Sequence, residues 1–135
     1  MNPETLPAAR RLFSAVRRGV AGIRGVEVAV APPFPYLASV RSDRRIGLAA
    51  QDVFWEARGA YTGAVSPTML RNLAVTYVIV GHSERRRIFG ESDETVSRKV
   101  RSALDAGLRP IIAVGEDVPD SEAVVPSVIA SQLDR

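Results

Sequence analysis

Polar side chains directly follow three short apolar segments of this 135-residue sequence, and they belong to Gln51, His82 and Glu116. In sheets built from alternating strands and helices, functional groups lie just past the carboxyl ends of the strands. If the apolar segments are strands, these three residues are the first candidates for chemistry. The imidazole of His82 stands out among them, because it can accept or donate a proton near neutral pH.

His82 is the only histidine in the sequence. A lone histidine is more often a structural residue than a catalyst, but the neighbouring residues favour a catalytic role here. Gly81 lets substrate or backbone approach closely, while Ser83 and Glu84 supply a cap and an acid at the start of a predicted helical turn. The positive end of a helix dipole disfavours imidazolium, so we expect His82 to be neutral. A neutral imidazole can donate a hydrogen bond to a substrate carbonyl and stabilise an enediolate.

The elements that must position these residues alternate between helices and apolar strands. The hydrophobic pattern predicts strands at 26–31, 46–50, 76–80 and 111–114. Helices are predicted to begin at the capping residues Asn2, Ser66 and Ser92, with shorter helical segments at 36–40 and 126–135. Apolar strands separated by amphipathic helices are typical of a parallel sheet covered on its faces. The predicted fold class is α/β, with about four parallel strands and covering helices.

Composition and charge exclude several classes of protein. The net charge is +3, with 18 basic residues against 15 acidic ones, and the arginines are spread along the chain rather than gathered into a stripe. Nucleic-acid binding is therefore a weak alternative. The absence of cysteine excludes disulfides and thiolate metal sites. No segment has the apolar core of a signal peptide or of a membrane span, so we expect a soluble, cytoplasmic protein.

Four motifs, spread over most of the chain, resemble those of triosephosphate isomerases. They are AAQD at 49–52, GAYTG at 59–63 with Ser66-Pro67, VGHSERR at 80–86 running on to FGESD at 89–93, and the segment 111–116. The resemblance implies a single, incomplete (β/α)8 TIM-barrel domain over residues 1–135, since a whole barrel has about 250 residues. It also implies an isomerase of glycolysis and gluconeogenesis, which interconverts dihydroxyacetone phosphate and glyceraldehyde 3-phosphate without metal or organic cofactor.

The resemblance further assigns roles to individual residues. It makes His82 the electrophile that polarises the substrate carbonyl, with Ser83 and Glu84 as close supports, although Glu84 could equally be a plain salt-bridge partner. It also implies a homodimer, with Thr62 near the partner's site. The residues that it places at or near the subunit interface are Gln51, Tyr61, Thr62, Gly63, Arg85 and Glu91. It also implies that Arg85, Arg86 and Glu91 are structural residues that tie their loop to its surroundings and to the neighbouring subunit. From composition alone, the loop at 61–63 is only a glycine-containing surface loop, and the charges at 85–91 are a solvated cluster.

Two catalytic groups of the resembled family match no residue in this sequence. They are a lysine at the end of the first strand and a glutamate base at the end of the sixth, and Lys99 does not replace the lysine because it lies inside a predicted helix. We expect the chain to lack the first strand and everything after the fifth barrel helix, and to be inactive by itself. Exposed strand edges would then favour aggregation or pairing. The alternative is a non-catalytic half-barrel that docks with itself or with a separate second half.

Overall fold

The computed structural model describes residues 2–40, 45–115 and 127–134. Within these ranges, all strands belong to one parallel sheet in the order β1-β2-β3-β4. The strands are β1 (Val28–Val30), β2 (Ile46–Ala50), β3 (Tyr77–Val80) and β4 (Arg109–Ile112). The predicted α/β class, with four parallel strands arranged as in part of a TIM barrel, is confirmed.

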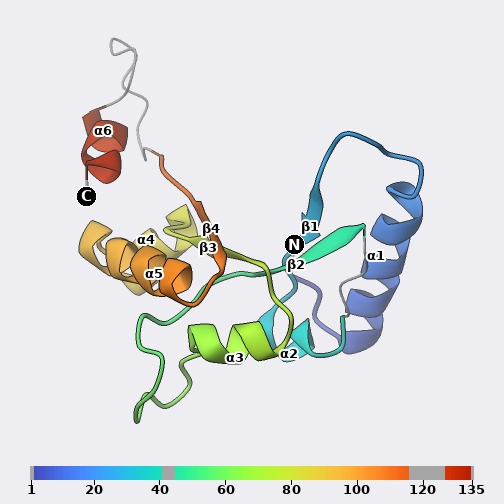
Figure 1. Ribbon diagram of the computed structural model, residues 1–135, viewed down its shortest axis with the longest axis horizontal. Helices are drawn as coiled ribbons and strands as arrows, with labels where there is room; N and C mark the ends of the chain where they lie inside the picture. Colours follow the sequence, from blue (N-terminus) through green and yellow to red (C-terminus); the bar gives the residue numbers. More distant parts are fainter. Residues whose placement is uncertain (1, 41–44, 116–126, 135) are drawn as a thin grey trace.

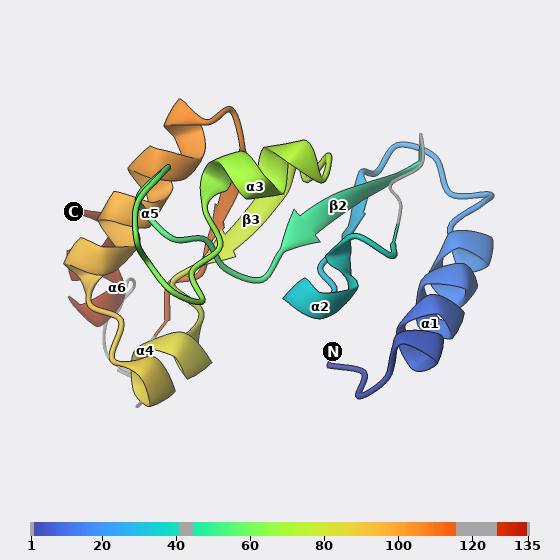
Figure 2. The ribbon, with the colours of Figure 1, turned by 90° about the horizontal axis from the view of Figure 1, so that it is seen from below.

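The helices are α1 (Leu6–Gly19), α2 (Phe34–Leu37), α3 (Pro67–Asn72), α4 (Ser83–Phe89), α5 (Asp93–Asp105) and α6 (Ser127–Leu133). Helix α1 lies beside β1 at one side of the sheet and α5 packs along β3 and β4 at the other, whereas α6 lies away from the strands (Figures 1 and 2). A loop over 54–65 leads from β2 to α3 and extends away from the sheet (Figure 1). Strands and helices therefore alternate, which brings the carboxyl ends of successive strands to one edge of the sheet.

The hydrophobic core lies between the sheet and the helices that cover it. Leu48 and Ala50 of β2 and Val78 and Val80 of β3 are at most 1% exposed. These residues alternate along their strands, so they point to the same face of the sheet. The helices contribute the facing apolar side chains, among them those of Leu37, Leu70, Val96 and Ala103. The core therefore fixes the two central strands, whose ends carry the candidate site.

The first helix begins at a different cap from the one that the sequence predicts. Thr5, not Asn2, is the N-cap of α1, and its hydroxyl accepts a hydrogen bond from the amide of Ala8 at 3.3 Å. The segment before it stays outside the helix, where the carbonyl of Glu4 accepts a hydrogen bond from the hydroxyl of Tyr36 at 2.9 Å. Asparagine and threonine are both good helix caps, so the local sequence allows the helix to begin at either residue. The contact between Tyr36 and Glu4 favours the later start, at Thr5.

The fourth strand begins two residues earlier than predicted, because Pro110 lies within the strand instead of before it. Arg109 pairs with Tyr77 and donates its amide to the carbonyl of Thr76 at 2.8 Å, and Ala113 donates to Val80 at 2.9 Å. Alternate residues of β4 donate their amides to β3, and Pro110 lies between two such residues. Its nitrogen therefore faces away from β3, and no hydrogen bond between β3 and β4 is lost. Smaller shifts affect two other elements: the first strand is shorter than 26–31, and the helix predicted at 36–40 begins at 34.

A cluster of three side chains crosses the sheet at the amino ends of its strands. The hydroxyl of Tyr77 contacts the carboxylate of Glu27, which precedes β1, and accepts a hydrogen bond from Arg109 of β4 at 2.6 Å. The Tyr77 ring lies over Gly47 of β2, where an added Cβ would meet the ring at 3.0 Å. The glycine therefore makes room for a tyrosine that links three strands.

The outer strand β4 exposes part of its apolar surface. Ile111 and Ile112 are each 47% exposed, and Val114, which follows the strand, is 37% exposed. Among the described strands, β1 and β4 are the two edges of the sheet. Across the described residues, no helix combines the length and apolarity that crossing a membrane requires.

Candidate active site

The carboxyl edge of the sheet holds two of the three residues singled out from the sequence. Gln51 follows β2, and its side-chain amide donates to the carbonyl of Ala31, just past β1, at 3.0 Å. His82 follows the adjacent strand β3 after a single glycine. The two residues therefore lie at the same edge of the sheet, as predicted. Glu116, the third candidate, lies outside the described residues.

The imidazole of His82 is half exposed, and its orientation is fixed from within its own helix. His82 is the N-cap of α4, and its Nδ1 accepts a hydrogen bond from the amide of Glu84 at 3.3 Å. An acceptor nitrogen carries no proton, so the neutral ring has its proton on Nε2. The side chain of His82 is 49% exposed, which leaves this N–H free to donate to a ligand. The geometry therefore provides a hydrogen-bond donor at the end of a buried strand.

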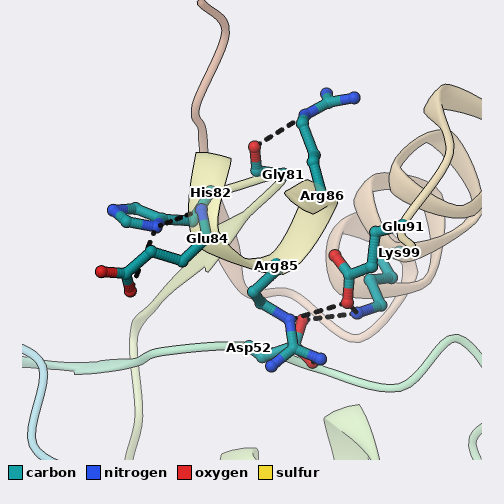
Figure 3. Close-up of polar contacts among 8 residues, drawn as sticks. All are labelled: Asp52, Gly81, His82, Glu84, Arg85, Arg86, Glu91 and Lys99. Atoms are coloured by element: carbon teal, nitrogen blue, oxygen red, sulfur yellow. Dashed lines mark hydrogen bonds and ion pairs between the residues drawn. The ribbon is translucent and has the colours of Figure 1, made fainter. Parts of the chain in front are cut away.

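The sequence prediction for Ser83 was wrong in one respect, because His82 caps the helix and Ser83 is its first residue. A histidine nitrogen here takes the part that a serine hydroxyl commonly plays. Glu84 is exposed, and its carboxylate lies 3.7 Å from Nδ1 of His82. That nitrogen already accepts the Glu84 amide, so the carboxylate is near the imidazole without sharing a proton with it (Figure 3).

Gly81 joins β3 to the helix with a backbone conformation that favours glycine. Its φ is +72°, in the left-handed region, and it is buried. An added Cβ would lie 3.0 Å from the carbonyl oxygen of Ala113, which is backbone and cannot move aside cheaply. Any other residue would therefore be strained and crowded, and the turn that presents His82 depends on glycine.

A buried ionic network lies on the other side of α4 from His82 (Figure 3). Lys99 of α5 is 3% exposed, and its ammonium contacts Asp52 at 2.6 Å and Glu91 at 2.5 Å. Arg85 of α4 binds the same two carboxylates, Asp52 at 2.9 Å and Glu91 at 2.7 Å. Two cations and two anions therefore alternate, so each buried charge has opposite charges beside it.

Burial and ion pairing compete in setting the pKa values of the two carboxyl groups. Burial raises the pKa of Asp52 above its ordinary value of 3.8, although Lys99 and Arg85 act in the opposite direction. Burial also raises the pKa of Glu91, but hydrogen bonds from Lys99 and Arg85 outweigh it and hold the pKa below 4.5. Oε2 of Glu91 is buried with no hydrogen-bond partner among the described residues, because Oε1 receives both cations. Glu91 therefore depends strongly on remaining paired.

The sequence predictions for this network were incomplete. Arg85 and Glu91 were expected to tie the loop to its surroundings and to a neighbouring subunit, and the structure shows ties within the chain, to Asp52 and Lys99, whose part was not predicted. With the Glu91 side chain only 6% exposed, the alternative of a solvated charge cluster is wrong.

The sequence did contain a signal for the role of Lys99, because its spacing from Val96 and Ala103 places it on the buried face of α5. A lysine on such a face needs an anionic partner.

The loop predicted to reach a partner subunit is folded against itself. Tyr61, Thr62 and Gly63 are exposed, and the rings of Phe54 and Tyr61 lie 4.7 Å apart. The amide of Phe54 donates to the carbonyl of Val65 at 2.9 Å, which closes the base of the loop. The loop therefore has a defined shape and an exposed end, while contact with a second subunit stays a prediction.

Within residues 2–40, 45–115 and 127–134, no three histidine, cysteine or acidic side chains are arranged to hold a metal ion. Asp52 and Glu91 come together, but Lys99 already occupies the space between them.

Comparisons with known proteins agree with this geometry. The model of the triosephosphate isomerase family matches residues 1–135. The chain belongs to the triosephosphate isomerase family. A triosephosphate isomerase of Pelobacter propionicus is 49% identical over 123 residues, which cover 89% of this chain and 49% of that protein. A triosephosphate isomerase of Roseiflexus sp. is 50% identical over 123 residues, which cover 89% of this chain and 48% of that protein.

A shorter match is closer in sequence. The triosephosphate isomerase of Thermoanaerobacter pseudethanolicus is 54% identical over 99 residues, which cover 71% of this chain and 40% of that protein. The chain spans about half the length of the curated relatives that it matches over 123 residues. These matches confirm the family that the four sequence motifs indicated.

Proposed function

We propose that these 135 residues form part of a triosephosphate isomerase, which interconverts dihydroxyacetone phosphate and D-glyceraldehyde 3-phosphate in the cytoplasm. The observation that carries the proposal is the geometry of His82. A neutral imidazole, with Nδ1 engaged by the Glu84 amide, presents its Nε2–H at the open edge of a parallel sheet. Membership of the family supports the choice of substrate.

In this mechanism, His82 donates its Nε2–H to the substrate carbonyl oxygen. Removal of a proton from the neighbouring carbon places negative charge on that oxygen, and a donor aimed at it stabilises the enediolate. Ser83 and Glu84, next in the chain, are close supports of the site. The network on the far side of α4 keeps the helix in place, so the donor needs little reorganisation during the reaction.

The isolated chain is proposed to be catalytically inactive. The glutamate base and the lysine that the resemblance implies match none of its residues. Without a base no group abstracts the proton, and without phosphate-binding loops little binding energy is available to orient the substrate. His82 alone therefore supplies only one part of the reaction.

The test is a steady-state isomerase assay on glyceraldehyde 3-phosphate. It compares the 135-residue chain with an in-frame longer form that supplies the lysine, base and phosphate loops, and it includes His82→Gln in both forms. We expect activity only in the longer form, and a loss of about 10²-fold or more in kcat in the variant, as for other oxyanion donors. Activity in the short chain that disappears with His82→Gln would show that another carboxylate here acts as the base.

We further propose a homodimer in which the 61–63 loop contacts the partner subunit. Support comes from a hollow of about 470 Å³ beside the ionic network, which is lined by Phe54, Gly63, Arg85 and Phe89 among others. An exposed loop end and a hollow near it suit reciprocal contacts between two copies. Sedimentation of the longer form tests this: Thr62→Arg should shift it from dimer to monomer, whereas Arg101→Gln, at an exposed position of α5, should not.

The exposed surface of β4 favours a second candidate function, a non-catalytic half-barrel that docks with another half. Ile111 and Ile112 lie in the edge strand β4 and point to its opposite faces, and each of them, like Val114 after the strand, is more than a third exposed. Such edges readily pair with other chains. Concentration-dependent association of the 135-residue chain that Ile112→Lys abolishes would support this candidate, and a monomeric chain at all concentrations would reject it.

A further inference from the structure

Arg86 binds the backbone on both sides of His82. Its Nε donates to the carbonyl of Gly81 at 2.8 Å (Figure 3), and its backbone amide donates to the carbonyl of His82 at 3.1 Å. These two carbonyls flank the Cα from which the imidazole extends. One residue therefore restrains the peptide before His82 and the peptide after it.

The guanidinium of Arg86 is itself held from a second element. Its Nη1 donates to Oδ1 of Asp93, in the first turn of α5, at 2.5 Å. The side chains of Arg86 and Asp93 are only 20% and 24% exposed, so solvent screens this ion pair less than it would a surface pair. The rigid fork of an arginine allows donors to two different acceptors to keep fixed directions. Arg86 therefore connects α5 to the turn that presents His82.

The space around Gly81 shows how closely this arrangement is packed. A Cβ at this position would lie 3.1 Å from Nη2 of Arg86 and 3.2 Å from Val96. The guanidinium thus forms one wall of the buried turn, alongside β4 and α5. Removing it would leave both a gap and an unpaired carbonyl where the chain adopts its left-handed conformation.

The imidazole of His82 is sensitive to such a change because, among the described residues, one long hydrogen bond orients it. Nδ1 accepts from the Glu84 amide at 3.3 Å, near the upper limit of distance for such a bond. A small rotation of the peptide between Gly81 and His82 would break this contact. The ring would then be free to carry its proton on either nitrogen.

We propose that Arg86 is a positioning residue for His82. Anchored by Asp93, it fixes the peptide between Gly81 and His82 so that Nδ1 accepts the Glu84 amide and Nε2–H points outward. The catalytic meaning of this inference rests on the proposed isomerase function. The orientation itself does not, because it can be measured without turnover.

The experiment measures the tautomer of His82 in the ¹⁵N-labelled 135-residue chain by long-range ¹H–¹⁵N NMR, at a pH where the ring is neutral. His82 is the chain's only histidine, so the spectrum contains one imidazole. The unmodified chain should show an unprotonated Nδ1 and a protonated Nε2. Arg86→Gln should give averaged signals from both tautomers. Arg87→Gln removes the same charge from the exposed neighbouring residue and should leave the spectrum unchanged.

A folded Arg86→Gln chain with the unmodified tautomer pattern would overturn the inference. If that variant does not fold, Asp93→Asn and Arg86→Lys replace it, since each keeps part of the contacts. Both should give a partial shift toward mixed tautomers, and an unmodified pattern in both would equally overturn the inference.

A kinetic measurement in the longer form separates this inference from the proposed function. Arg86→Gln should lower kcat about 10-fold to 100-fold while KM changes less than about twofold, as expected when a reacting group is misplaced. If His82→Gln leaves kcat unchanged, the proposed function fails, whatever the NMR spectrum shows. If only the tautomer of Arg86→Gln is unchanged, the proposed function stands and the positioning role fails.

Discussion

The two sides of helix α4 differ in nearly every physical respect. On one side, His82 and Glu84 are exposed and share a single long hydrogen bond. On the other, Arg85 joins a network in which the Lys99 ammonium is 3% exposed and every charge has an opposite charge within 3 Å. Under the proposed function, reactivity belongs to the exposed side of α4 and stability to the side with the ionic network. Substitutions on the network side should change the free energy of unfolding, and those on the exposed side should change activity.

The largest effect on stability is expected from Lys99→Met. The variant removes the central cation and leaves Asp52 and Glu91 facing each other in a buried site. Breaking one partner of a buried ion pair costs about 3–5 kcal/mol. Urea unfolding measures the loss, and Arg98→Gln is the matched control because its ion pair with Glu56 is exposed. The control should cost less than about 1 kcal/mol. Equal losses in the two variants would contradict the division.

Gly81→Ala should have the next largest effect. Left-handed backbone costs a non-glycine residue about 1–2 kcal/mol, and overlap with the Ala113 carbonyl adds to this. Gly90→Ala is the control, since its φ of +68° is nearly the same and an added Cβ there meets nothing within 4 Å. Thermal unfolding should show the larger loss for Gly81→Ala. If the two variants lose the same amount, the turn before His82 is less tightly packed than described.

The pH dependence of stability should reveal Glu91. Its pKa in the folded chain lies below the ordinary 4.5, so its contribution to stability is present above that pH and is lost as the pH falls through the folded pKa. Glu91→Gln should therefore reduce the loss of stability on acidification below about pH 4.5. Urea unfolding at several pH values measures the slope. An unchanged slope would mean that other carboxyl groups control acid unfolding.

The smallest effect on stability is expected from Glu84→Gln. The side chain is exposed and its carboxylate makes no close ion pair, so unfolding should change by less than about 0.5 kcal/mol. An isomerase assay of the longer form then decides between the two roles considered for Glu84. A lower kcat at unchanged stability identifies a support of the site, and no change identifies a surface charge.

Local patterns in the sequence were sufficient for most of the fold. The strand at Ile46–Ala50 was predicted at its observed bounds, and Ser66 and Ser92 cap helices as expected. Errors arose where long-range contacts decided between local alternatives. Thr5 replaced Asn2 as a cap, and a proline was accommodated inside β4 because its nitrogen faces away from β3.

The candidate site was only partly predictable for the same reason. Its position at the strand ends followed from the apolar segments, so His82 and Gln51 were found. The partners of Lys99 lie 47 and 8 residues away in sequence, and no spacing rule pairs them. Arg86 was expected only to tie its loop to its surroundings and to a neighbouring subunit, because a contact with the backbone carbonyl of Gly81 leaves no mark on composition.

The tyrosine cluster at the amino ends of the strands has a consequence for protein engineering. Glu27, Tyr77 and Arg109 link three strands at the end of the sheet opposite to His82. Glu27 and Arg109 are more than 60% exposed, so neighbouring surface positions tolerate variation. A library directed at this end could raise thermostability without altering the geometry around the imidazole. Substitutions at the carboxyl edge that raise thermostability would instead change the residues around the imidazole, and we expect them to lower the turnover of the proposed enzyme.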